Sequence, residues 1–162
     1  MVDVVARAVD CKDEIYKTYY PNPLVSSTLL GCVDKRRDMT AGGAKYNFNS
    51  ISARGLGMVT DSLAAMKVFV FEQKKFSMGQ MLKFIRTDFM GNEKERAFLQ
   101  NKGPRYGMDD DLADSIAKEI VDYFCSEVSR RKTIRGGVYR PGFFSYGMHV
   151  LDGLFLAATA DG

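Results

Sequence analysis

The sequence predicts a helix-rich α/β chain with two to three strands, and three observations support this fold class. Residues 44–51 alternate between two sets of side chains, which is typical of a strand. Residues 112–128 carry apolar side chains at helical spacing, and residues 58–72 are apolar nearly all round, as in a buried helix. Residues 138–150 and 154–159 are again rich in β-forming residues. Long helices between strands indicate an α/β arrangement, in which the helices should flank a larger parallel sheet.

The composition excludes several classes of protein. The chain has 162 residues, of which 46% are hydrophobic and 27% charged, as expected of one globular domain with its own core. The net charge is only +3 and the basic residues are scattered, so no nucleic-acid surface is predicted. No apolar run approaches the ~18–20 residues that span a bilayer, and charged residues within positions 1–10 exclude a signal peptide. We therefore expect a soluble, cytoplasmic protein that binds neither nucleic acid nor membrane.

Two helices and a strand are predicted in the first third of the chain. Residues 2–19 form an amphipathic pattern that Pro21 ends. Asn22 followed by Pro23 is typical of a helix start and predicts a second helix through about Cys32. A polar turn over residues 34–43 then leads into the strand at 44–51.

The rest of the chain predicts four helices and further strands. Residues 58–72 are apolar nearly all round, which predicts a buried helix. Ser77 and Gln80 form a capping-box pattern before the next helix, and a short helix should cover 93–100. Residues 109–128 form the clearest helical pattern, with acidic residues at its start. A turn at 152–153 should join the two β-rich segments.

Few residues suggest chemistry by their spacing. Cys32 follows a glycine and precedes Asp34 by two residues, as a reactive thiol near a base would, but a cysteine packed as a small hydrophobe is the favoured interpretation. Asp109, Asp110 and Asp111 are consecutive, and consecutive side chains on a helix point in different directions. They are therefore expected to cap the helix rather than to bind one metal ion together. His149 is the single histidine and no CxxC motif occurs, so no metal site is predicted. Residue spacing alone therefore predicts an α/β chain and no specific function.

Six sequence blocks carry a family resemblance. In chain order they are GGAKYNF (42–48), DSLAAMK (61–67), PRYGMDDD (104–111), RGG (135–137), PGFFS (141–145) and the terminal DG (161–162). Together they resemble signatures of the glycyl radical enzymes, the pyruvate formate-lyase-like family, and most of all its branch of glycerol dehydratase and choline trimethylamine-lyase. Met108 and Ala160 depart from the pattern, because asparagine and proline are usual there.

The resemblance implies that residues 1–162 are an internal fragment of a ten-stranded α/β barrel, in the second half of its wall. Cys32 matches a second Gly-Cys of the family rather than its thiyl cysteine. The thiyl-cysteine loop is expected before Met1 and the glycyl radical loop after Gly162, since the chain ends inside a family motif. No catalytic residue, bound cofactor or metal is therefore expected in these residues, and the fragment alone should be inactive.

For the parent enzyme the resemblance implies a lyase or dehydratase that cleaves a C–O, C–N or C–C bond of a small polar substrate by anaerobic radical chemistry. Its expected partners are a radical S-adenosylmethionine activating enzyme, the substrate and a second copy in a homodimer. The substrate-pocket candidates are Phe144, Ser145, Tyr146 and His149, on a segment similar to a pocket-lining strand; alternatively, these side chains face the helical shell. The competing interpretation is a non-catalytic α/β scaffold or binding module derived from the barrel.

Overall fold

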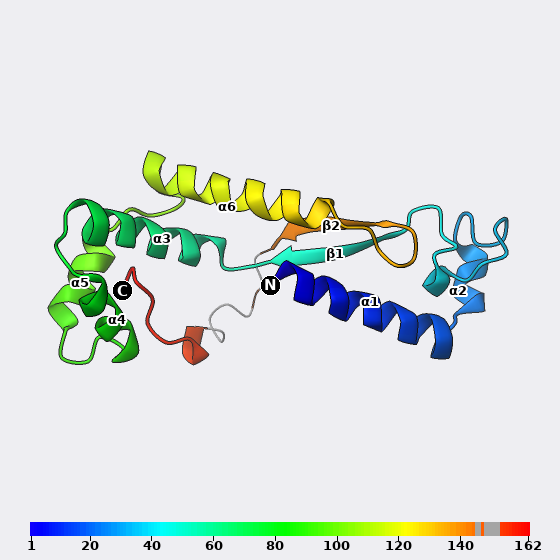
Figure 1. Cartoon of the computed structure of the whole chain (residues 1–162), viewed down its shortest axis with the longest axis horizontal. Coiled ribbons are helices and arrows are strands. Elements are labelled where there is room, and N and C mark those ends of the chain that lie inside the picture. The colour runs from blue at the N-terminus through cyan, green and yellow to red at the C-terminus, as the bar shows by residue number, and fades with distance from the viewer. Residues whose placement is uncertain (145–146, 148–152) are drawn as a thin grey trace. The chain divides into compact units, whose positions relative to one another are not determined.

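The computed structural model describes residues 1–144, 147 and 153–162, and these form two compact units. The first unit consists of Met1–Ala53 and Asp122–Gly142, and the second of Arg54–Val121 and Phe143–Gly162. Figure 1 shows the elements along the chain. Helix α6 (Asp111–Ser129) begins in the second unit and ends in the first.

The first unit holds two strands and two α-helices besides the end of α6. The helices are α1 (Val2–Tyr19) and α2 (Pro23–Thr28), followed by a 3-10 turn, η1 (Met39–Ala41). Strands β1 (Phe48–Ala53) and β2 (Val138–Phe143) pair and run parallel (Figure 1). The helix-rich prediction with two strands is confirmed for this part. The predicted strand at 154–159 is wrong, because 153–155 form a helical turn and 156–159 no strand.

Helix α2 starts as predicted but ends earlier. Asn22 Oδ1 accepts a hydrogen bond from the backbone N–H of Val25 at 3.1 Å, which is the predicted cap. The helix stops at Thr28 rather than near Cys32 because the next residue, Leu29, is extended (φ −96°, ψ 131°). The hydroxyl of Thr28 bonds the carbonyl of Val25 at 2.8 Å, a local side-chain bond of the kind that competes with helix continuation.

Strand β1 begins at Phe48 rather than at residue 44. The backbone N–H of Lys45 bonds the carbonyl of Leu30 at 2.7 Å, so this part of the chain is tied to the preceding turn instead of to a strand. Within β1 the polar Asn49 is buried and Phe48 is exposed. The alternation continues through β1, where Asn49 shares the buried face with Ile51, and Ser50 and Ser52 share the exposed face with Phe48.

A small core holds the first unit together. It joins α1, β1, β2 and the end of α6 through four buried residues, with three partly buried residues packed against them: Ala6, Ile51, Val128 and Tyr139, then Val2, Val9 and Phe124. Burial of this apolar surface is the main favourable contribution to folding of the unit.

The second unit is helical. It contains α3 (Leu56–Met66), a π-helical turn η2 (Lys67–Glu72), α4 (Met78–Arg86), α5 (Glu93–Lys102) and the start of α6. The predicted capping box is confirmed: Ser77 N–H donates to Gln80 Oε1 at 2.8 Å and Gln80 N–H to Ser77 Oγ at 3.2 Å. Among the described residues, nine buried side chains form its core: Ala65, Phe69, Val70, Phe76, Met81, Phe84, Phe89, Leu99 and Ala160.

The segment predicted as one buried helix, 58–72, is buried on one face only. Ala64, Ala65 and Phe69 are inside, whereas the ring of Phe71 is 62% exposed. Met58, Val59 and Leu63 on α3 are also exposed. The prediction of a buried helix is therefore wrong for one face of 58–72, which the described residues leave uncovered. In the described part of the chain, no helix combines the length and apolar character needed to cross a bilayer.

Candidate functional site

The predicted pocket residues follow strand β2. Phe144 lies directly after the strand and is 47% exposed. Ser145, Tyr146 and His149 lie outside the described residues. The structure therefore positions the start of the predicted pocket segment, and which way its remaining side chains point stays a prediction.

Arg105 joins three separate stretches of the second unit. Its Nη1 lies 2.6 Å from Oδ2 of Asp161 and 3.3 Å from Oδ2 of Asp61. Its Nη2 donates to the carbonyls of Gln100 and Asp161, each at 3.2 Å. The backbone N–H of Tyr106 donates to the second oxygen of Asp61 at 2.7 Å. One planar guanidinium thus bridges α3, the loop after α5 and the end of the chain.

Asp161 is the most enclosed carboxylate of this group. Its Oδ1 accepts hydrogen bonds from Thr159 Oγ1 at 2.6 Å and Ser62 Oγ at 2.9 Å. Burial raises the pKa of Asp161, but the hydrogen bonds from Thr159 and Ser62 and the charge of Arg105 together outweigh burial and hold the pKa below its ordinary value. Asp161 is therefore an ionised anchor at neutral pH, not a proton donor.

The glycines of two sequence blocks are explained by close backbone contacts in the first unit. A Cβ on Gly137 would lie 2.1 Å from the carbonyl oxygen of Asn47, and a Cβ on Gly42 would lie 2.4 Å from that of Arg135. Asn47 Nδ2 donates to the Arg135 carbonyl at 2.8 Å. Only glycine allows these two loops to approach so closely.

A buried polar cluster connects α1, β1 and the loop before β2. Asn49 Nδ2 donates to Asp13 Oδ2 at 2.6 Å, and Arg135 Nη2 donates to Asn49 Oδ1 at 2.7 Å. Arg135 Nε lies 2.9 Å from Asp13 Oδ2, although its hydrogen is not aimed at that oxygen. Asp13 is 4% exposed and Asn49 9%, so the hydrogen bonds of Asn49 to Asp13 and Arg135 form away from solvent.

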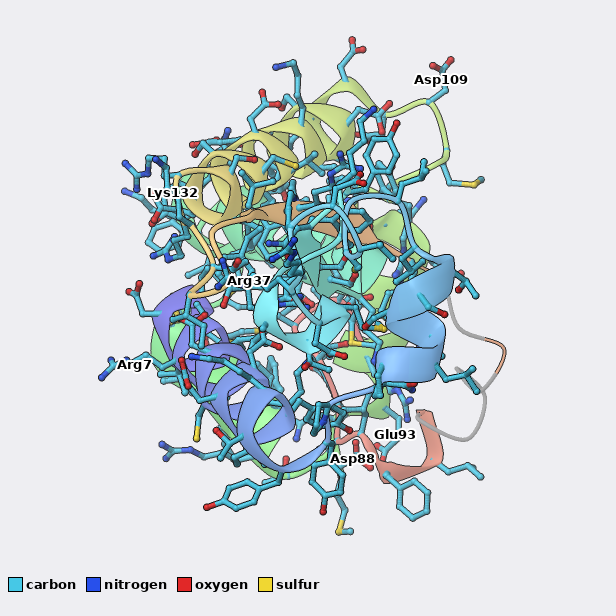
Figure 2. The ribbon with its side chains drawn as sticks, turned by 90° about the vertical axis from the view of Figure 1, so that its right-hand side faces the viewer. Arg7, Arg37, Asp88, Glu93, Asp109 and Lys132 are labelled. Atoms are coloured by element: carbon cyan, nitrogen blue, oxygen red, sulfur yellow. The ribbon has the colours of Figure 1, made fainter. Side chains whose placement is uncertain are left out.

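An open cavity of about 290 Å³ lies between α1, the chain after α6 and β2. Its lining comprises Asp3, Ala6, Arg7, Asp10, Arg131, Lys132 and Tyr139. Figure 2 shows Arg7 extending from α1 into solvent. Arg131 is bound by Asp3, and Tyr139 Oη lies 2.7 Å from Asp10 Oδ1. Burial, reinforced by the hydrogen bond to Asp10, raises the pKa of Tyr139, so its phenol stays neutral and cannot act as a base.

The other sequence candidates are structural where the structure describes them. Asp110 Oδ1 accepts from the backbone N–H groups of Leu112 and Ala113 at 3.1 and 3.0 Å, the capping role that the sequence predicted. Asp109 points away from the ribbon in the loop before α6 (Figure 2). Cys32 is buried, as expected of a cysteine packed as a small hydrophobe. Among the described residues, no group of acidic, histidine or cysteine side chains could hold a metal ion.

The sequence did not predict that Asp61, Arg105 and Asp161 come together. The sequence offered one indication of this contact: each of the three residues lies in one of the six blocks that resemble the family. Sequence separations of 44 and 56 residues to Arg105 hide the contact. The cluster of Asp61, Arg105 and Asp161 holds chain segments in place through strong, directed hydrogen bonds. It presents no exposed nucleophile, so its role is structural.

Comparison with known proteins gives a consistent result. The family model described as Pyruvate formate lyase-like matches residues 1–153. The chain is 37% identical to trans-4-hydroxy-L-proline dehydratase of Clostridioides difficile, covering 100% of this chain and 20% of that protein. It is 36% identical to (2S)-3-sulfopropanediol dehydratase of Klebsiella oxytoca, covering 99% and 20%. The chain thus spans about a fifth of the length of these curated relatives.

Solved structures agree over the same extent. The crystal structure of hydroxyproline dehydratase from Clostridioides difficile, with trans-4-hydroxy-L-proline bound, matches 100% of this chain and 20% of its own, with a TM-score of 0.93 and 37% identity. A glycerol-bound glycerol dehydratase from Clostridium butyricum matches 99% of this chain and 20% of its own, with a TM-score of 0.91 and 32% identity.

Proposed function

Since this chain belongs to the pyruvate formate lyase-like family, the glycyl radical enzymes, we propose that it forms part of the barrel wall of a dehydratase or lyase that cleaves a C–O, C–N or C–C bond of a small polar substrate. The observation that carries the proposal is that all of residues 1–162 match, in sequence and in fold, a fifth of a substrate-bound hydroxyproline dehydratase. A ten-stranded barrel, the size typical of the family, is part of this proposal.

Within the parent enzyme, the proposed role of residues 1–162 is to bind and orient the substrate. In such an enzyme a glycyl radical supplies the hydrogen abstraction that starts bond cleavage, and we place it outside residues 1–162. The residues after β2 would line the pocket: the hydroxyls of Ser145 and Tyr146 would hydrogen-bond polar groups of the substrate, with Phe144 and His149 beside them. Correct placement of the substrate in a closed, dry site is worth several orders of magnitude in rate.

The proposal also covers the activating enzyme, the oligomeric state and the oxygen sensitivity of the parent enzyme. A radical S-adenosylmethionine activating enzyme would generate the radical, the enzyme would act as a cytoplasmic homodimer, and oxygen would inactivate it. The relatives include dehydratases, sulfite-lyases and a decarboxylase subunit. Among these we favour a dehydratase, because the two relatives at 36–37% identity are both dehydratases.

The experiment that tests this function is activation of the longest reading frame that contains these residues. After anaerobic incubation with an activating enzyme and S-adenosylmethionine, we expect the electron paramagnetic resonance signal of a glycyl radical and turnover of a hydroxylated substrate such as trans-4-hydroxy-L-proline or glycerol. Ser145→Ala and Tyr146→Phe should raise KM, whereas Ser50→Ala, at an exposed position of β1, should not. A reading frame confined to these 162 residues, or the absence of a radical signal, would refute the proposal.

A second candidate is a binding module or scaffold without catalysis. It is favoured by one observation: in the described residues, the clusters around Arg105 and Arg135 are engaged in structural hydrogen bonds. A genuine start codon at Met1 and a stop codon after Gly162 would support it, and a stable monomeric chain that melts cooperatively would then be expected.

A further inference from the structure

The sheet of the first unit, formed by β1 and residues 138–142 of β2, is covered on one face by the described residues. On that face, Ile51 and Tyr139 pack against α1 and the end of α6. The opposite face, here called the open face, carries the exposed residues of both strands: Phe48, Ser50, Ser52, Val138 and Arg140. Parallel sheets are normally covered on both faces, so the open face lacks a layer that such a sheet requires.

Two contacts show that the open face is an ordered surface. The guanidinium carbon of Arg140 lies 4.3 Å from the centre of the Phe48 ring, as in a cation–π pair. A Cβ on Gly142 would lie 3.1 Å from Ser52 Oγ, so a side chain at that position would crowd the serine. The aromatic ring therefore holds the arginine against the sheet, and the glycine leaves space beside Ser52.

Arg140 is a cation without a counter-charge on this surface. Among the described residues it contacts the Phe48 ring, and no carboxylate pairs with it. By contrast, Arg131 and Arg135 of the same unit each pair with an aspartate. Covering an arginine with further protein is costly unless the cover supplies an acceptor, because a buried charge needs a partner. The missing layer should therefore bring a carboxylate to Arg140.

We propose that the open face binds a carboxylate-bearing segment of the parent protein, drawn from its chain outside residues 1–162, with the carboxylate paired to Arg140. The relatives are long enough to provide such a segment, because the match covers only 20% of each. The inference uses the proposed place of this chain in a barrel wall, but none of the radical chemistry. Phe48 and Val138 give the same face an apolar part, so the bound segment should also carry apolar side chains.

The test measures the reactivity of a thiol on the open face of the protein encoded by the full reading frame. Ser52→Cys is introduced together with Cys11→Ser, because Cys11 is exposed and would react as well. Maleimide labelling is followed by mass spectrometry of the peptide that contains position 52. A covered face should slow this labelling roughly tenfold or more in the native protein relative to the protein in urea. Equal rates in the two states would overturn the proposal.

A second set of variants tests the ion pair. Added to Ser52→Cys, Arg140→Gln should speed native labelling roughly tenfold, since the cover loses a charge-assisted hydrogen bond. Arg140→Lys keeps the charge and should retain most of the protection. Arg7→Gln, at an exposed arginine of α1 in the same unit, is the matched control and should leave the rate unchanged. An Arg140→Gln protein with full protection would overturn the ion pair.

Two further outcomes separate the alternatives. Protection that weakens on dilution would identify a second copy of the protein as the cover, and this would overturn the proposal. Labelling requires neither activation nor substrate, so an enzyme without a radical signal would refute the proposed function and leave this test intact. The labelling rate of Ser52→Cys alone decides whether the face is covered, even if Arg140→Gln fails to fold.

Discussion

Arg105 Nη1 lies 2.6 Å from Oδ2 of Asp161, a residue 56 positions away, and this ion pair connects two of the sequence blocks by which the family is identified. Asp61, in a third block, shares the same guanidinium. Three of these blocks are therefore joined by one network of charged side chains in the second unit.

The pH dependence of stability should reflect Asp161. Its pKa is lowered in the folded protein, so it contributes stability that is present above the unfolded value near pH 4 and is lost as pH falls through the folded value. Asp161→Asn should cost about 2 kcal/mol at pH 7, less than a fully buried pair because the Arg105 side chain is 30% exposed. Urea denaturation at pH 7 and pH 3 would measure this difference. Equal losses at both pH values would contradict it.

Alanine at Gly43 should destabilise the first unit. A Cβ there would lie 1.8 Å from the carbonyl oxygen of Arg37, so the two backbones must separate. We expect a loss of roughly 2–3 kcal/mol in the free energy of unfolding. Gly79→Ala is the matched control: this glycine lies inside α4 with nothing closer than 3.9 Å, and alanine should leave stability unchanged or raise it by up to about 1 kcal/mol. If both variants behaved alike, the close approach would have no energetic role.

Removing the Tyr139 hydroxyl should change alkaline stability. The raised pKa of the phenol means that it favours the folded protein below pH 10, the unfolded value, and that this contribution is lost as pH rises further. Tyr139→Phe should cost about 1 kcal/mol at pH 7, since one buried hydrogen bond is lost, and should flatten the fall in stability above pH 10. Tyr123→Phe, an exposed tyrosine of α6, provides the control, and thermal melts at pH 7 and pH 10.5 the measurement.

Residues 1–162 expressed alone should associate through their exposed apolar faces. Phe71 is 62% exposed and lies in the π-helical turn that directly follows α3, which also carries exposed apolar residues. Phe71→Gln should reduce light scattering and dye binding without loss of helix content, whereas Phe69→Gln, at a residue that is 3% exposed, should unfold the second unit. A monomeric wild-type chain that melts cooperatively would argue that these faces need no further cover.

Much of the local structure could be predicted from residue patterns. The caps at Asn22, Ser77 and Asp110 are short-range features, since each donor and acceptor lie within three residues along the chain. The end of α2 and the start of β1 were misplaced by about four residues, because the bond from Lys45 N–H to the Leu30 carbonyl is a tertiary contact. The strand expected at 154–159 is absent for a similar reason: Asp88 and the helical core bind that part of the chain instead.

By itself, the sequence determined the α/β class, the helices, their caps and, through the order of its blocks, membership of the glycyl radical enzymes. Only the tertiary structure decided that Asn49 is buried, that one face of 58–72 stays exposed and that Arg105 joins Asp61 to Asp161. The reason is physical: a helix cap or an apolar stripe depends on neighbours a few residues apart. An ion pair between distant segments instead depends on which parts of the chain the packed core brings within 4 Å of each other.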